Sequence, residues 1–97
     1  MAIRVIIERK VKEGQQVEMM KILRDLRSLA LYQKGYISGE TLRDRDDPSR
    51  YIVISSWESV DDWETWQNHA ERAKVLKKLE KYLVSPEKSS VFLFVYF

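Results

Sequence analysis

The segment Val91–Phe97 restricts the fold of this 97-residue chain more than any other part of the sequence. All seven of its residues are apolar or aromatic, and none is charged, glycine or proline. Alternate residues of a strand point to opposite faces of a sheet, so this strand carries large side chains on both faces. Left uncovered, such a strand is prone to pair with other chains. We therefore expect a partner to cover whichever face the chain's own helices leave open.

The first third of the sequence predicts a strand followed by a helix. Apolar and polar residues alternate over residues 2–9, with Ile3, Val5 and Ile7 on one face, which is typical of a strand. From residue 15 to residue 33 the apolar residues recur every three or four positions, which indicates an amphipathic helix. Gly35 suits the end of that helix, because glycine readily adopts the left-handed conformation found there.

The rest of the sequence predicts a hairpin, a second helix and a last strand. Two β-rich stretches, 36–43 and 50–57, flank an Asp-, Pro- and Ser-containing turn. Ser59, with Asp62 three residues later, predicts the start of a helix that runs to about Leu83. A strand over 90–97 then closes the chain. The buried stripe of the second helix is expected to comprise Trp63, Trp66, Ala70, Ala73, Leu76 or Leu79, and Leu83.

This β-α-β-β-α-β order is that of the ferredoxin-like α+β fold, a four-stranded antiparallel sheet with two helices on one face. We expect a single domain spanning 1–97. Folding should bury roughly 65% of the surface that the unfolded chain exposes. Both helices cover the same face, so the other face carries exposed apolar side chains. The simplest way to bury them is a homodimer formed through the open sheet face.

Composition excludes several classes of function. Seventeen Lys and Arg residues against fifteen Asp and Glu leave a net charge of +2, which is too small to predict a nucleic-acid partner. The absence of cysteine excludes disulfides, thiolate nucleophiles and cysteine-based metal sites. No apolar run has the roughly 18 residues that a membrane span needs. We expect a soluble, cytoplasmic protein that contacts no membrane.

Three residues of the second predicted helix are candidates for a site. Trp63 and Trp66 lie on the same side of the helix, where they either pack in the core or form the wall of a pocket for a flat ligand. His69, the only histidine, follows one turn after Trp66. It is a candidate general base or haem ligand, although a lone helical histidine more often has no such role.

Several stretches together resemble the antibiotic biosynthesis monooxygenase (ABM) domain family. The similarity covers nearly the whole chain, and it implies a dimeric α+β barrel in which two ferredoxin-like subunits pack sheet to sheet. The residues that carry it are Gly35–Asp44, Asp47–Ser59, Asp62, Trp63, Trp66, Glu71, Arg72 and Leu83–Pro86.

The resemblance implies two kinds of chemistry. Some members are cofactor-free oxygenases that bind a quinol-like aromatic substrate between helices and sheet, and Trp63, Trp66, Tyr51 and Arg43 are suited to hold it. Haem-degrading members use an Asn on the first strand, near Glu8 here, together with a Trp and a later His on the second helix. Trp66 fits that Trp position, but Leu76 stands where the haem-ligating His is expected.

We therefore expect a cofactor-independent monooxygenase for a small aromatic molecule. Its catalytic candidates are Trp66 and His69, and its substrate-binding candidates are Trp63, Trp66, Tyr51, Arg43 and Glu8, with no metal and no cofactor. The first alternative is a non-catalytic small-molecule-binding or structural dimer, and haem degradation is the less favoured one. A cavity below roughly 300 Å³ between Trp66 and the sheet would favour the structural dimer.

Overall fold

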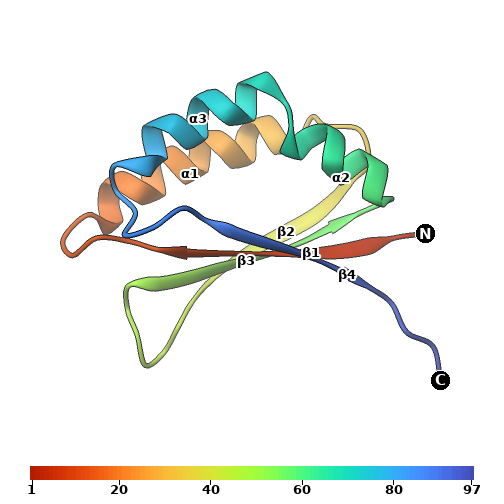
Figure 1. The fold of residues 1–97 in the computed structure, drawn as a ribbon, viewed down its shortest axis with the longest axis horizontal. Coiled ribbons are helices and arrows are strands. Elements are labelled where there is room, and N and C mark those ends of the chain that lie inside the picture. The colour runs from red at the N-terminus through yellow and green to blue at the C-terminus, as the bar shows by residue number, and fades with distance from the viewer.

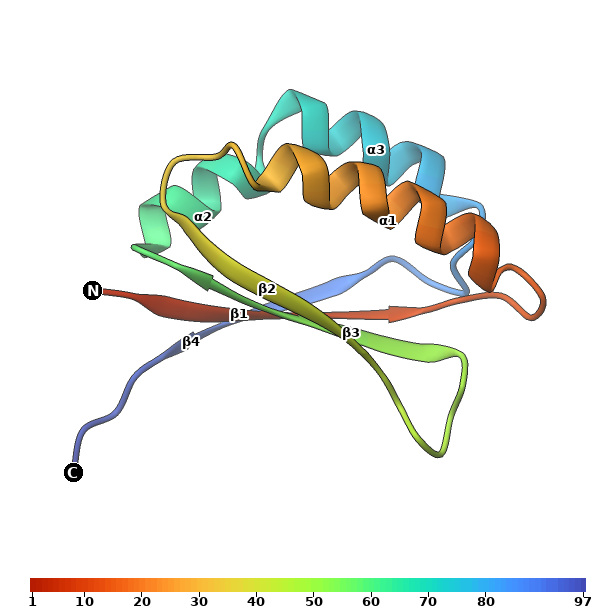
Figure 2. The same ribbon diagram turned by 180° about the vertical axis from the view of Figure 1, so that it is seen from behind.

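The structure is a computed structural model that describes residues 1–97. Its strands form one antiparallel sheet in the order β2-β3-β1-β4, and its helices all lie on one face of that sheet (Figures 1 and 2). No helix combines the length and the apolar character needed to cross a membrane. The elements are β1 (Ile3–Lys10), α1 (Gln16–Ala30), β2 (Tyr36–Arg43), β3 (Arg50–Trp57), α2 (Val60–Gln67), α3 (Ala70–Glu80) and β4 (Lys88–Leu93).

The two faces of the sheet follow the alternation in the sequence. In β1, Ile3, Val5 and Ile7 are buried under the helices, and Trp57 on β3 pairs with Ile3 in the same row. The intervening residues of β1 point to the face that no helix covers. The ferredoxin-like α+β fold is confirmed, and the hairpin strands have the predicted bounds.

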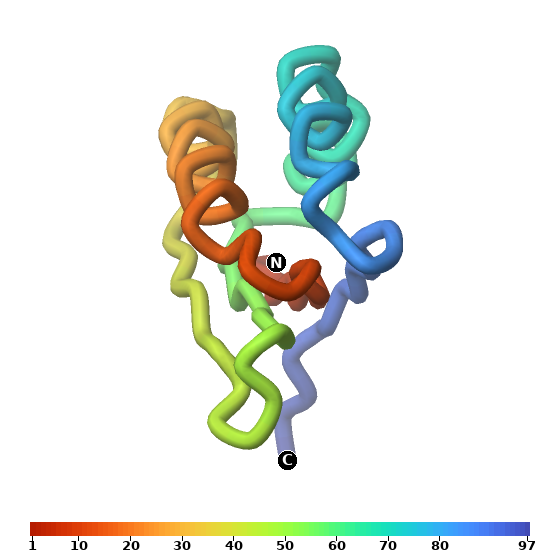
Figure 3. The backbone as a smooth tube through the Cα atoms, turned by 90° about the vertical axis from the view of Figure 1, so that its left-hand side faces the viewer, coloured from red at the N-terminus to blue at the C-terminus, as the bar shows by residue number.

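The core lies between the helices and the covered face of the sheet. Viewed from its end, the molecule has α1 and α3 side by side above the strands (Figure 3). Trp57 is 1% exposed and occupies the middle of an aromatic group. Its ring centroid lies 5.3 Å from Tyr36 and 5.7 Å from Trp63, both in edge-to-face geometry, which is a favourable arrangement for aromatic rings.

The second predicted helix is two helices, so the covering layer contains three helices rather than two. His69 breaks the helix because its backbone is extended, with ψ at 138°, and its Nδ1 accepts a hydrogen bond from the backbone N–H of Glu71. The break shifts the helical register, so the predicted stripe is only partly correct. Trp63, Trp66, Leu79 and Leu83 are buried as predicted, whereas Ala70 and Ala73 are exposed and Arg72 and Val75 are buried.

The last strand is shorter than predicted. β4 ends at Leu93, which pairs with Ile3, the first residue of β1, so almost no chain remains for residues 94–97 to pair with. These four residues leave the sheet at its edge (Figure 1). Val91 is 41% exposed and Phe92 is 50% exposed, so the apolar segment lacks cover on both of its faces.

Two glycines with positive φ allow a matched test of packing. Gly35 has a φ of 83°, and a Cβ there would collide with the carboxyl group of Asp62. Gly14 has a φ of 76°, but a Cβ there would meet nothing within 4 Å. We expect Gly14→Ala to lower the free energy of unfolding by about 1 kcal/mol through backbone strain alone. Gly35→Ala should cost about 1–3 kcal/mol more because of overpacking.

Urea denaturation of the two variants measures this difference. Equal losses for Gly14→Ala and Gly35→Ala would contradict the close packing of Asp62 on Gly35.

Candidate functional site

A cavity of about 80 Å³ lies between the helices and the covered face of the sheet. Residues from β1, α1, β2, β3, α2 and α3 border it, so both the sheet and the helical layer contribute to its wall. Exposed residues of α1 and β2 are also part of the wall, which marks its open side. The apolar and aromatic wall includes Ile7, Leu26, Tyr36, Val53, Trp57, Trp63 and Trp66.

The aromatic part of the wall follows from local structure. The Ser59 hydroxyl accepts a hydrogen bond of 3.1 Å from the backbone N–H of Asp62 and so fixes the start of α2. Trp63 and Trp66 are three residues apart, so they share one face of that helix. They are 2% and 3% exposed. The Nε1–H of Trp57 donates to the buried Ser55 hydroxyl at 3.2 Å, which fixes the orientation of a third indole.

The polar part of the wall contains two buried arginines that share one carboxylate. Arg9 is 4% exposed and Arg72 is 3% exposed. Arg9 donates from Nε to Oε1 of Glu87 at 2.9 Å, and its Nη2 lies 2.8 Å from the same oxygen. Arg72 donates from Nη2 to Oε2 at 2.7 Å. Two guanidinium groups on one carboxylate leave an excess positive charge at this end of the cavity.

Burial and ion pairing shift the pKa values of Glu87 and Arg9 in opposite directions. Burial alone raises the pKa of Glu87, but the charges and hydrogen bonds of Arg9 and Arg72 outweigh it, so the pKa lies below its ordinary value. Burial lowers the pKa of Arg9, with Glu87 opposing the shift, and the guanidinium remains charged. Arg72 also lies over the ring of Trp63, with 5.3 Å between the guanidinium carbon and the ring centroid.

The structure brings only some of the predicted site residues to the cavity. Trp63 and Trp66 border it. Tyr51 is buried on the same face of the sheet, and Arg43 pairs with it at the exposed end of β2, but neither borders the cavity. Glu8 lies on the opposite face, where it pairs with Arg50, and it does not border the cavity.

His69 has a structural contact that sequence analysis did not predict. It is the N-cap of α3, and its Nδ1 is occupied by the backbone N–H of Glu71. Its ring centroid is 5.5 Å from that of Trp66, but the residue does not border the cavity. No cluster of His, Asp and Glu side chains that could hold a metal ion is present.

Sequence analysis did not identify Arg9, Arg72 and Glu87 as a group. One signal was available, because Arg9 continues the alternation of Ile3, Val5 and Ile7 and therefore occupies a position facing the helices. The other two required the structure. Arg72 is buried in the register that α3 takes after the break at His69, and Glu87 lies in the loop before β4.

Fold and cavity together define a ferredoxin-like α+β protein with an aromatic cavity between its helices and its sheet. The family model described as antibiotic biosynthesis monooxygenase matches residues 2–78. The chain therefore belongs to the antibiotic biosynthesis monooxygenase family.

Individual relatives are distant. Protein SchA of Streptomyces halstedii is 24% identical over 81 residues, which are 84% of this chain and 21% of SchA, so the chain spans about a fifth of that relative. Two solved structures have the same fold. SnoaB of Streptomyces nogalater, a cofactor-independent oxygenase, has a TM-score of 0.86 at 16% identity, covering 99% of this chain and 95% of SnoaB. A Nitrosomonas europaea protein with the same family description has a TM-score of 0.87 at 16% identity, covering 98% and 91% of the two chains.

Acid titration tests the group formed by Arg9, Arg72 and Glu87. The folded pKa of Glu87 is depressed, so its stabilisation is present above the ordinary value of 4.5 and is lost as the pH falls through the lower folded pKa. We expect the free energy of unfolding to fall with pH below about 4.5. Glu87→Gln should flatten that dependence and, by breaking a buried pair, cost on the order of 3 kcal/mol at pH 7.

The control is Glu18→Gln, which removes a carboxylate that is 49% exposed in its pair with Lys21. Urea denaturation at several pH values compares the two variants. The same pH dependence in Glu87→Gln and in the unmodified protein would contradict the assignment.

Proposed function

We propose that this protein is a cofactor-independent monooxygenase that acts on a small aromatic, quinol-type substrate in the cavity between helices and sheet. The observation that carries the proposal is the enclosure of that cavity by Trp57, Trp63 and Trp66, with buried guanidinium groups at one end. In this reaction one atom of O₂ enters the ring and the other leaves as water. The substrate supplies the electrons and becomes a quinone.

The residues of the cavity suit such a reaction. A substrate that reduces O₂ by itself reacts most readily as its anion, so the site has to hold that anion, stack its ring and keep out water. The indoles of Trp57, Trp63 and Trp66 provide flat apolar surfaces. Arg72 provides positive charge where the surrounding protein lowers the effective dielectric constant.

The size of the cavity favours the second candidate function. Its volume of about 80 Å³ is well below the roughly 300 Å³ that distinguishes a typical ligand site from a packing void. By that measure, a non-catalytic small-molecule-binding or structural dimer of the same fold is the alternative. A monooxygenase with this cavity needs either a small substrate or widening on the open side, between α1 and β2, where Arg27 and Thr41 are exposed.

We also propose that two copies of the chain pair through the open sheet face, in the cytoplasm. That face carries apolar side chains from all four strands, and Leu42 and Phe92 on it are 44% and 50% exposed. The unpaired residues 94–97 add to the apolar surface at the adjacent edge. The chain's own helices cannot cover this surface, because all of them lie on the other face (Figure 2).

Haem degradation has less support from the site. Leu76 occupies the position at which the resemblance to haem-degrading members implies a ligating histidine, and Glu8 points to the face opposite the cavity. We therefore propose that the reaction uses no cofactor.

Oxygen consumption tests the proposed activity. The protein is mixed with a panel of small quinols, and O₂ uptake is followed with an electrode. We expect uptake above the spontaneous rate and a loss of about tenfold or more in Trp66→Ala, because removing the indole opens the wall of the cavity to water. The control is Tyr32→Ala, which removes an aromatic residue that is 90% exposed and away from the cavity.

No uptake with any quinol, or equal uptake in Trp66→Ala and the unmodified protein, would support the non-catalytic alternative. Titration with haem should leave the Soret band of free haem unshifted. A Trp66-dependent shift would instead support the haem-degrading alternative.

Light scattering tests the proposed dimer. We expect a mass of twice the 11.6 kDa of one chain at micromolar concentration. Phe92→Glu should shift the mass towards the monomer, because it puts a charge into the buried apolar contact. Val17→Glu, which changes a residue that is 66% exposed on α1, is the matched control. A mass of 11.6 kDa for the unmodified protein would contradict the pairing.

A further inference from the structure

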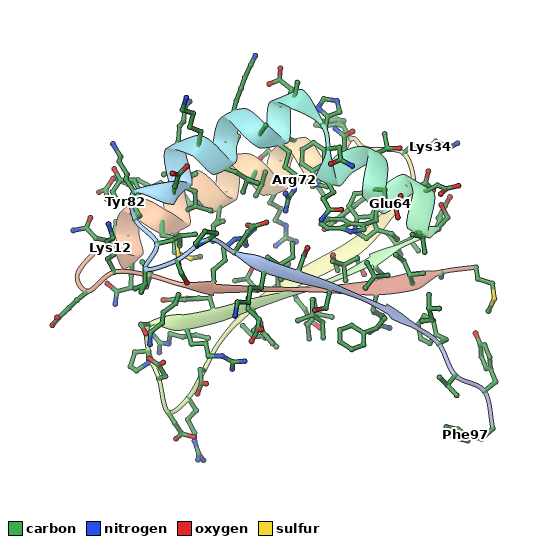
Figure 4. The ribbon with its side chains drawn as sticks, in the orientation of Figure 1. Lys12, Lys34, Glu64, Arg72, Tyr82 and Phe97 are labelled. Carbon is green, nitrogen blue, oxygen red and sulfur yellow. The ribbon has the colours of Figure 1, made fainter.

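A polar groove of about 260 Å³ lies on the open face of the sheet, where no helix covers the side chains (Figure 4). Residues of β1, β2 and β3 form it, and only one of them is apolar. They are Arg4, Ser38, Gly39, Glu40, Ile54 and Ser56. The open face is therefore not uniformly apolar, and whatever covers it has to match a polar groove as well as the apolar side chains around it.

The groove carries one charge of each sign, on opposite sides of β3. Arg4 on β1 is in register with Ser56, and Glu40 on β2 is in register with Ile54. Both charged residues are exposed, and neither forms an ion pair within the chain. The guanidinium carbon of Arg4 instead lies 5.5 Å from the ring centroid of Phe94. The chain therefore leaves two complementary charges of this groove unpaired.

The other charged residues of the open face lie towards its opposite end. Glu8 and Lys10 of β1 are in register there with Lys88 and Arg50 respectively. The Glu8 carboxylate pairs with the Arg50 guanidinium, so it is already compensated within the chain. The groove is thus the part of this face in which a negative and a positive side chain each lack a partner.

A second copy on the open face would remove both charges of the groove from water. A buried charge without a partner is costly, and contact with the opposite charge offsets much of that cost. A twofold interface offers such a contact twice, because residue i of one copy meets residue j of the other and j meets i. Opposite charges on the two sides of one groove have the arrangement that this exchange requires.

The positions of the two charges define where the twofold axis lies. An axis that separates Arg4 from Glu40 passes over β3 between Ile54 and Ser56 and runs obliquely to the strands. Rotation about it turns the two open faces towards each other, as two packed sheets require. Arg4 of each copy is then opposite Glu40 of the other, while Ile54 and Ser56 lie near their own counterparts.

We propose that Arg4 of each copy forms an ion pair with Glu40 of the partner subunit, so that two symmetric ion pairs set the register of the dimer. The apolar side chains of the open face provide the contact area. The ion pairs select the partner, because a sheet without the complementary charges would leave both groups buried and unpaired. The inference rests on the proposed dimer and is independent of the proposed reaction.

Charge reversal tests these ion pairs. Arg4→Glu places two carboxylates against each other at both symmetric positions, and Glu40→Arg does the same with two guanidinium groups. We expect each variant to raise the Kd of the dimer by about a hundredfold or more, as measured by light scattering over a dilution series.

An equimolar mixture of Arg4→Glu and Glu40→Arg should restore the dimer, because each contact then joins a carboxylate of one variant to a guanidinium of the other. Native mass spectrometry should identify the restored species as one copy of each variant. The two substitutions combined in one chain should restore the homodimer. Arg24→Glu on α1 and Glu64→Arg on α2 are the matched controls, because they reverse exposed charges on the helical side. Alone or mixed, they should dimerise like the unmodified protein.

The outcomes separate the ion pairs from the dimer itself. Dimers of unchanged affinity in both reversal variants would overturn the ion pairs and leave the dimer. Restoration in the doubly substituted chain but not in the mixture would place the ion pair within one chain and overturn the proposal. A monomeric unmodified protein would refute the dimer and the ion pairs together, whereas oxygen uptake from quinols tests the reaction separately.

Discussion

The contact of Arg9 and Arg72 with Glu87 joins three parts of this fold that lie far apart in the sequence. Arg9 and Glu87 are separated by 78 residues, and Arg72 comes from the helical layer above them. The shared carboxylate therefore holds α3 to β1 and fixes the loop that leads into β4. Removing it would leave two guanidinium groups buried without compensation, which is costly in a low-dielectric interior. The cavity lies beside this contact. Arg9 and Arg72 border it, and they give this end of the cavity its positive charge.

The chain covers one face of the sheet and leaves the other face uncovered. The covered face is filled by side chains of β1 and β3, with three tryptophans and the arginine pair around the remaining space. The open face and the edge at β4 carry apolar residues that no element of the chain covers. A second copy on the open face and a ligand within the covered face would each complete one side of the same sheet. The proposed dimer and the proposed ligand site are thus independent of each other.

The sequence predicts the fold well because the signals of the fold are local. Alternation in β1, the three- and four-residue spacing in α1 and the Ser59 cap of α2 all depend on neighbouring residues. The break at His69 is also local, since its imidazole accepts a hydrogen bond from the backbone N–H of Glu71, but histidine is not one of the residue types by which an N-cap is recognised in a sequence. The site is predictable only in its aromatic half. Trp63 and Trp66 are identified by residue type, whereas the link between Arg9, Arg72 and Glu87 exists only in the folded chain.

A crystal structure of the protein with bound 4-nitrophenolate tests the central claim most directly, namely that the cavity between helices and sheet is a ligand site rather than a packing void. The account predicts the ring among Trp57, Trp63 and Trp66, with the phenolate oxygen beside the guanidinium of Arg72. It also predicts a cavity that has widened between α1 and β2. Density for the probe on the open sheet face alone, with the cavity unchanged, would contradict it.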